Sequence, residues 1–192
     1  MLNVPDTHGP ALHALRVAGW LEADRLSLWQ VTEPLETITR LIESGHVRQV
    51  RSPRGEMYGL TPAGTERATS LAAGWLGEST RAERAALTAA LAGFEAHDST
   101  LKQLVTAYQR GAIEAVAEQL RELHDRARDA LNAVGSAIPL WESYPARLEN
   151  AALRVEKGEL GYLASPLLES YHTVWHVAHR DMRLVCEELN TS

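Results

Sequence analysis

The chain has 192 residues, of which 45% are hydrophobic and 23% charged, enough for one large or two small folded domains. Its single cysteine excludes an internal disulfide framework, and no apolar run approaches the roughly 18 residues of a membrane-spanning helix. We therefore expect a cytoplasmic protein without a membrane segment. The net charge of −6 argues against a broadly basic nucleic-acid-binding surface.

The chain opens with two short predicted helices. Apolar residues recur at helical spacing over residues 11–16 and 25–31, with a break near residues 22–24. Trp20 and Trp29 are most simply core residues that hold these helices against a third one.

The third helix begins near Pro34. Its apolar residues keep helical spacing and predict one buried stripe, formed by Leu35, Ile38, Leu41 and Ile42. The outward face then carries Glu36, Thr37, Thr39, Arg40, Glu43 and Ser44. Gly45 supplies the left-handed residue that often ends a helix.

Beyond Gly45 the apolar period changes from about 3.6 to about 2, which predicts a β-hairpin. The strands are expected over residues 46–51 and 56–60, with a turn at 52–55. Thr61 and Pro62 then start another helix, as N-cap and first helical residue. Helix, two-stranded hairpin and helix, in that order, indicate a winged helix.

Residues 39–64 read TRLIESGHVRQVRSPRGEMYGLTPAG. This segment resembles the recognition helix, wing and LTPAG segment of MarR-like winged helix-turn-helix transcriptional regulators, and the resemblance extends over roughly residues 9–75. It implies binding to double-stranded DNA, usually as a dimer, and often a ligand that changes the affinity.

Seven residues are the predicted DNA contacts. The recognition helix would read base edges and phosphates in the major groove, and Arg54 at the wing tip suits a narrow minor groove. The full set is Glu36, Thr37, Thr39, Arg40, Arg48, Arg51 and Arg54. Residues 1–75 hold seven arginines and eight acidic residues, so phosphate contacts must come from these few cations. The alternative is a winged helix that serves as a protein-interaction module.

A second domain follows a break at residues 77–79. Residues 80–83 have the capping-box form, and the text is helical from there on. We predict a mainly α protein, with a winged helix over residues 1–77 and an all-helical dimerisation and possible effector-binding domain over 78–192. Its helices are expected at 81–96, 99–110, 112–134, 145–157 and 166–189.

Residues 144–148 and 165–176 contain a second resemblance. With its SYHTVW signature, this stretch resembles a helical module that accompanies small winged-helix proteins and some phosphoenolpyruvate-utilising dikinase-type enzymes. The swivelling and nucleotide-grasp motifs of those enzymes are absent from the sequence. The resemblance therefore supports the two-part architecture and implies no kinase activity.

The last helix carries a row of histidines beside its apolar stripe. His172, His176 and His179 lie within about 60° of one another on a helical projection, with Glu169 and Arg183 close by. Three interpretations stay open: ordinary packing, a pocket for an anionic effector, or a metal site. The pocket would use Tyr171, His172, Trp175, His176, His179 and Arg183; the metal site would use the three histidines and Glu169, although Arg183 disfavours a cation.

No sequence motif predicts catalysis. A nucleophile elbow, a phosphate-binding loop, a dinucleotide fingerprint and a zinc-protease motif are all absent, and Cys186 falls in an apolar stripe. We expect a non-enzymatic, cofactor-free, dimeric transcription regulator with a possible small-molecule effector. The competing functions are a protein-interaction module that regulates a dikinase-type enzyme, and a metal sensor that uses the histidine row.

Overall fold

The computed structural model describes residues 8–53 and 55–189. The chain forms two compact units: the first runs to Thr80 and includes the end of the last helix from Glu187, and the second spans Arg81–Cys186. The predicted mainly helical fold is confirmed. Within the described ranges, no helix combines the length and apolar character needed to cross a membrane.

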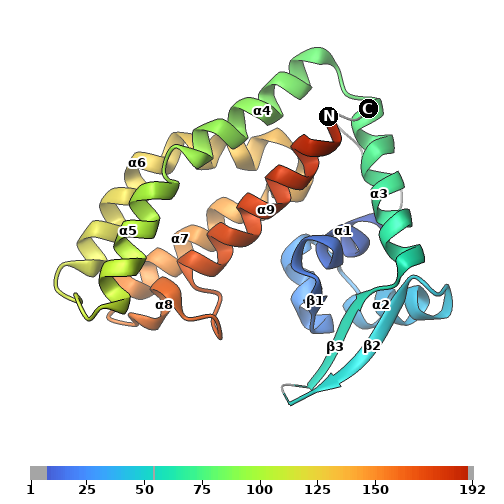
Figure 1. The fold of residues 1–192 in the computed structure, drawn as a ribbon, viewed down its shortest axis with the longest axis horizontal. Helices are drawn as coiled ribbons and strands as arrows, with labels where there is room; N and C mark the ends of the chain where they lie inside the picture. The colour runs from blue at the N-terminus through green and yellow to red at the C-terminus, as the bar shows by residue number, and fades with distance from the viewer. Residues whose placement is uncertain (1–7, 54, 190–192) are drawn as a thin grey trace. The chain divides into compact units, whose positions relative to one another are not determined.

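The first unit alternates short helices with three short strands. In chain order these are α1 (Gly9–Ala18), β1 (Trp20–Leu21), the 3₁₀ helix η1 (Ala23–Trp29), α2 (Pro34–Glu43), β2 (Val47–Ser52), β3 (Gly55–Leu60) and α3 (Pro62–Gly77). The strands form an antiparallel sheet in the order β1–β3–β2. The hairpin of β2 and β3 extends beyond the helices of its unit as a wing (Figure 1).

Two elements of this unit differ from the prediction. The expected two-stranded wing gains a third strand, because β1 pairs with β3 through Trp20 and Gly59. The expected helix at 25–31 is a 3₁₀ helix that starts and ends two residues earlier. It stops at Gln30, whose φ of 63° is left-handed and incompatible with a continuing helix.

The predicted buried stripe of α2 was too wide. Ile38 and Leu41 are buried, at 2% and 3% exposure, but Leu35 is 69% and Ile42 38% exposed. At 100° per residue, the direction midway between Ile38 and Leu41 lies about 90° from Leu35 and about 70° from Ile42. These two side chains therefore flank the buried edge and belong to the outward face of α2.

The junction between α2, the wing and α3 explains the LTPAG segment. The Thr61 hydroxyl accepts a hydrogen bond from the Gly64 amide at 3.0 Å and donates one to the Gly45 carbonyl at 2.7 Å. The Thr61 amide donates to the His46 carbonyl at 2.9 Å. Thr61 thus caps α3 and ties it to the end of α2.

Gly64 is needed because the same carbonyl closes over it. A Cβ at this position would lie 1.9 Å from the His46 carbonyl oxygen, which is backbone and cannot rotate away. Gly45 has a left-handed φ of 75°, and the His46 amide returns to the Leu41 carbonyl at 2.9 Å. The chain therefore turns sharply enough to bring residue 46 against α3.

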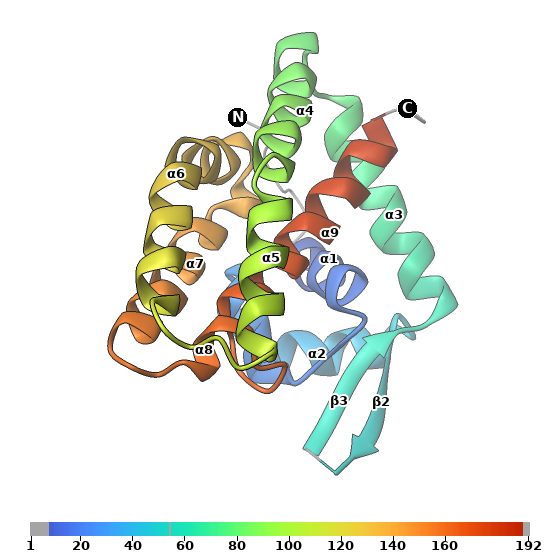
Figure 2. The ribbon, with the colours of Figure 1, turned by 60° about the vertical axis from the view of Figure 1, so that its left-hand side comes forward.

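The second unit is all-helical. Its elements are α4 (Arg81–Glu95), α5 (Asp98–Gln109), α6 (Val116–Ala137), the 3₁₀ turn η2 (Pro139–Trp141), α7 (Ser143–Glu156), α8 (Gly161–Ala164) and α9 (Tyr171–Leu189). The long helix α6 packs on α4, α5 and α7 (Figure 2). Apolar residues at helical spacing form its buried face, at Val116, Leu120, Leu123, Ala127, Leu131 and Val134.

Helix α9 starts at Tyr171, five residues later than predicted. The residue before it, buried Ser170, caps the helix: its hydroxyl accepts a hydrogen bond from the Thr173 amide at 3.3 Å. The predicted stripe of α9 is confirmed as core from Tyr171 to Val185. Buried Asp181 interrupts this core and accepts a hydrogen bond from the Tyr144 hydroxyl of α7 at 2.6 Å.

We predict that Gly64→Ala destabilises the first unit by about 1–3 kcal/mol, because the new methyl group overpacks against the His46 carbonyl. Urea denaturation followed by circular dichroism measures the change. Gly74→Ala, in the same helix with open space around its Cβ position, is the control and should stabilise by up to about 1 kcal/mol. Equal midpoints for the two variants would contradict the close contact.

Candidate functional site

The outward face of α2 carries one arginine and two glutamates and is partly apolar. Glu36, Thr39 and Arg40 are exposed and Thr37 is half-buried. The Thr39 hydroxyl donates to the Leu35 carbonyl at 2.8 Å, and Arg40 forms an ion pair with Glu36 one turn earlier. Arg40 must leave Glu36 before it can contact another anion, and this exchange reduces the free energy that Arg40 can contribute to anion binding.

The wing holds its arginines in two different ways. Arg51 is largely exposed, 3.9 Å from the Glu56 carboxylate on the opposing strand. The Arg48 guanidinium lies over the indole of Trp20, 5.1 Å from the ring centre. Arg54, predicted at the wing tip, lies outside the described residues.

The Arg48–Trp20 stack depends on Gly59. Sheet pairing places Trp20, Gly59 and Arg48 in one row across β1, β3 and β2. A Cβ on Gly59 would lie 2.8 Å from the Trp20 ring, so only glycine lets the indole lie flat over the middle strand. Trp20 stays 38% exposed beneath the guanidinium, which limits the rotamers of Arg48.

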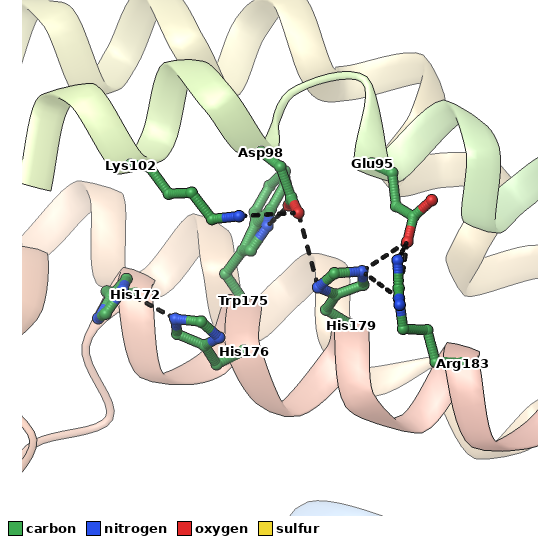
Figure 3. A network of polar contacts seen from close by, with 8 residues as sticks. All are labelled: Glu95, Asp98, Lys102, His172, Trp175, His176, His179 and Arg183. Carbon is green, nitrogen blue, oxygen red and sulfur yellow. Dashed lines mark hydrogen bonds and ion pairs between the residues drawn. The ribbon is translucent and has the colours of Figure 1, made fainter.

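The histidine row of α9 divides into two separate groups (Figure 3). The Nε2 atoms of His172 and His176 lie 2.9 Å apart. His179 instead faces α4 and α5: its Nε2 is 2.7 Å from a Glu95 oxygen, and its Nδ1 is 3.6 Å from an Asp98 oxygen. The predicted row is therefore a pair of imidazoles followed by an imidazole between two carboxylates.

Glu95 and Asp98 also bind the neighbours of His179. Arg183 donates to the same Glu95 oxygen from Nε at 2.8 Å and from Nη2 at 2.7 Å. The Trp175 indole donates to Asp98 at 2.6 Å, and Lys102 lies 3.8 Å from the other Asp98 oxygen. The cation that disfavoured a metal site in the sequence thus has a carboxylate partner from α4.

The two aromatic residues of the predicted effector pocket are core residues. Tyr171 and Trp175 are 0% and 2% exposed, and Trp175 stacks on Phe94 with ring centres 3.8 Å apart. A metal site with three or more histidine, cysteine or carboxylate ligands is absent from residues 8–53 and 55–189. Glu169, the fourth candidate ligand, forms an ion pair with Arg147.

An open pocket of about 450 Å³ lies between α6 and α7. None of the six predicted effector residues lines it; its wall consists of His124, Arg128, Leu131, Asn132, Pro145, Ala146 and Glu149. The Glu149 carboxylate accepts hydrogen bonds from both Nη atoms of Arg121, each at 3.0 Å. It also lies 2.7 Å from Nε2 of His124. Nδ1 of His124 lies 3.3 Å from the Tyr171 hydroxyl.

On this side of the pocket, Glu149, Arg121, His124 and Tyr171 are paired with one another. With Nε2–H of His124 donating to Glu149, its Nδ1 is free to accept from Tyr171. The hydrogen bonds from Arg121 lower the pKa of Glu149, and burial lowers the pKa of His124, which favours the neutral imidazole. The polar groups that remain at the rim are the exposed Asn132 and the exposed Arg128, which forms an ion pair with Asp125 of the preceding turn.

Sequence reasoning missed several of these partners. Glu95, Asp98, Arg121 and Glu149 lie on helices far from α9 in the chain, so no local spacing marks them. Gly59, in the interior of a predicted strand, was an available signal of close approach. Cys186 is buried as predicted, and burial raises its pKa to about 11, far from that of a nucleophilic thiol.

We predict that Glu95 makes the stability of the second unit pH-dependent. Its pKa is lowered, first by the hydrogen bond with His179 and then by Arg183. A carboxyl with a lowered folded pKa contributes fully above its ordinary value of 4.5 and loses that contribution as the pH falls through the folded value.

Urea denaturation at a series of pH values from pH 3 to 7, spaced by about one pH unit, tests this dependence. Glu95→Gln should lower the unfolding free energy at pH 7 and flatten its fall in acid. Glu122→Gln, an exposed change on α6, should follow the wild-type profile. Superimposable profiles for wild type and Glu95→Gln would refute the assigned pairing.

Comparisons with models of protein families, with curated proteins and with solved structures find no match to this chain. The two family resemblances stay predictions from the sequence, and the site geometry alone supports a functional proposal.

Proposed function

We propose that the chain is a sequence-specific, double-stranded DNA-binding transcription regulator that acts as a homodimer. The observation that carries the proposal is the winged-helix order of the first unit, in which α2 presents a polar face and the adjoining wing carries exposed arginines. Such a helix fits the major groove, while the wing contacts the backbone or the minor groove.

The charges of this surface define how it would bind. Arg40 is offset by Glu36, whereas Arg48 is held on Trp20 and Arg51 is exposed on the wing. Few phosphates can be neutralised by so few cations, so non-specific affinity is low. Two copies reading half-sites about one DNA turn, roughly 34 Å, apart would supply the missing affinity.

We predict that selection from a random duplex library yields a two-half-site sequence and that Arg48→Ala/Arg51→Ala binds it more weakly. Each lost phosphate contact lowers the slope of log K against log salt by about 0.9, so the double variant should lose about 2. Fluorescence anisotropy over a salt series measures the slope, and light scattering measures the dimer.

The matched control is Arg110→Ala/Arg126→Ala, which removes two exposed charges from the second unit. Its slope should equal that of the wild type. Failure of the wild-type protein to enrich any duplex would reject the proposal, and equal slopes for both double variants would reject the wing as the contact surface.

The pocket between α6 and α7 supports effector binding. Leu131, Pro145 and Ala146 offer apolar contact, while Arg128 and Asn132 can donate hydrogen bonds at the rim. Because Glu149 is already paired with Arg121 and His124, the donors at the rim select an anion, which Arg128 can bind by exchanging its Asp125 partner. The effector we propose is a small carboxylic acid with an apolar body, bound here rather than beside the histidine row.

We predict that a thermal-shift screen of small carboxylic acids finds a compound that raises the melting temperature of the wild type and not of Arg128→Ala. The physical reason is the loss of the one exposed cation on the pocket wall. Arg126→Ala, an equally exposed arginine outside that wall, should keep the shift. Retention of the shift in Arg128→Ala would place the ligand elsewhere.

A second candidate function is a protein-interaction module. Leu35 and Ile42 are exposed next to Thr39 in projection, at one edge of the outward face of α2, and this apolar edge suits a protein partner better than phosphate. If library selection enriches no duplex, this face of α2 is the surface on which to test protein binding, with Leu35→Ser as the disrupting variant.

A further inference from the structure

We infer that His172 and His176 form a two-imidazole binding site for a divalent first-row transition ion such as Zn²⁺. The site goes beyond the proposed DNA and effector binding, and it uses only the first half of the predicted histidine row. It rests on the close approach of the two Nε2 atoms, on their access to solvent and on the fact that, among residues 8–53 and 55–189, their hydrogen bond is to each other.

The first step is the spacing. One helical turn separates the two residues, so their side chains project from the same edge of α9. The Nε2 atoms lie 2.9 Å apart, as adjacent ligands of one ion do when each metal–nitrogen distance is about 2.0–2.1 Å and the angle at the metal is near 90°.

The second step is convergence. The ring centres are 4.4 Å apart while the Nε2 atoms are only 2.9 Å apart, so the lines from each centre through its Nε2 approach one another. For two rings tilted equally in one plane, these lines would meet roughly 2 Å beyond the nitrogens, which is the histidine–zinc distance. The two rings also stand nearly perpendicular, at 81°, which keeps their carbon atoms apart.

An ordinary hydrogen bond between the imidazoles fits less well. A linear N–H···N bond puts both nitrogens on the line between the ring centres and would separate the centres by roughly 5 Å. The observed 4.4 Å between the centres is shorter, so a hydrogen bond between the two nitrogens is bent. A shared ion between the nitrogens removes this conflict.

The third step is the state and accessibility of the ligands. Imidazole binds a metal ion through a deprotonated ring nitrogen, which neutral histidine provides. His176 is exposed and His172 is half-buried, so an ion can enter from solvent. Two imidazoles at an angle near 90° leave the other coordination positions of the ion for water or an outside ligand.

The neighbouring groups set the limits of the site. His179 is turned toward Glu95 and Asp98 and does not join the pair. Lys102 and Arg183 are both drawn to those carboxylates, so their charges are partly balanced. Two neutral ligands without a carboxylate predict micromolar rather than structural-site affinity, and imidazole favours Zn²⁺, Ni²⁺ or Cu²⁺ over Mg²⁺ or Ca²⁺.

Isothermal titration of the untagged full chain with ZnCl₂ tests the inference. We expect saturable binding by the wild type, with no response to MgCl₂. Loss of an outer-shell partner typically costs about 10- to 100-fold in metal affinity, so His176→Gln, which removes a ligand, should lose at least tenfold. His97→Gln, at a half-exposed histidine outside the pair, should bind like the wild type.

Circular dichroism without metal checks that His176→Gln is folded; if it is not, His172→Gln takes its place. One ion per chain supports the site as described, and one ion per two chains supports it with a second copy filling the open positions. Equal zinc affinity in wild type and the folded variant overturns the inference, as does the absence of zinc binding by the wild type. Neither result bears on DNA binding.

Discussion

The second unit depends on how α9 is bound to the helices around it. Its buried stripe supplies the shared core, but apolar burial alone does not select a register. The register is set by four polar contacts, one to each long neighbour: Glu95 of α4, Asp98 of α5, His124 of α6 and Tyr144 of α7. Each places a specific side chain of α9 opposite a specific partner, so a slip by one residue would leave buried polar groups unpaired.

The same contacts determine which groups are left for ligands. Trp175 and Tyr171 are engaged in core packing and in hydrogen bonds, and His179 is paired with Glu95 and Asp98. What remains on α9 is the His172–His176 pair. On α6 and α7, pairing of Glu149 with Arg121 and His124 likewise leaves Asn132 and the Asp125-paired Arg128 as the polar groups at the rim of the pocket. The packing of the helices thus limits which side chains are available to bind a ligand.

In the first unit, one threonine and three glycines place the proposed reading surface. Thr61 joins the cap of α3 to the end of α2, and Gly45 and Gly64 allow the close approach of that turn. Gly59 lets Trp20 lie flat under Arg48. These contacts hold the surface in one shape. Because the surface is also nearly uncharged, specificity for DNA would have to come from its geometry and from the pairing of two copies rather than from electrostatic attraction.

The sequence alone determined the elements that depend on local signals. Period, caps and glycines were sufficient for the mainly helical class, the hairpin at residues 46–60, the start of α3 at Pro62 and the buried stripe of α9, because these follow from neighbours a few residues apart. Only the tertiary structure decided what long-range contacts control. It exposed Leu35 and Ile42, moved the start of α9 to Tyr171 and divided the histidine row. The partners that separate His179 from the other two histidines, Glu95 and Asp98, lie more than 70 residues before α9 in the chain. No rule of local spacing can predict such distant contacts.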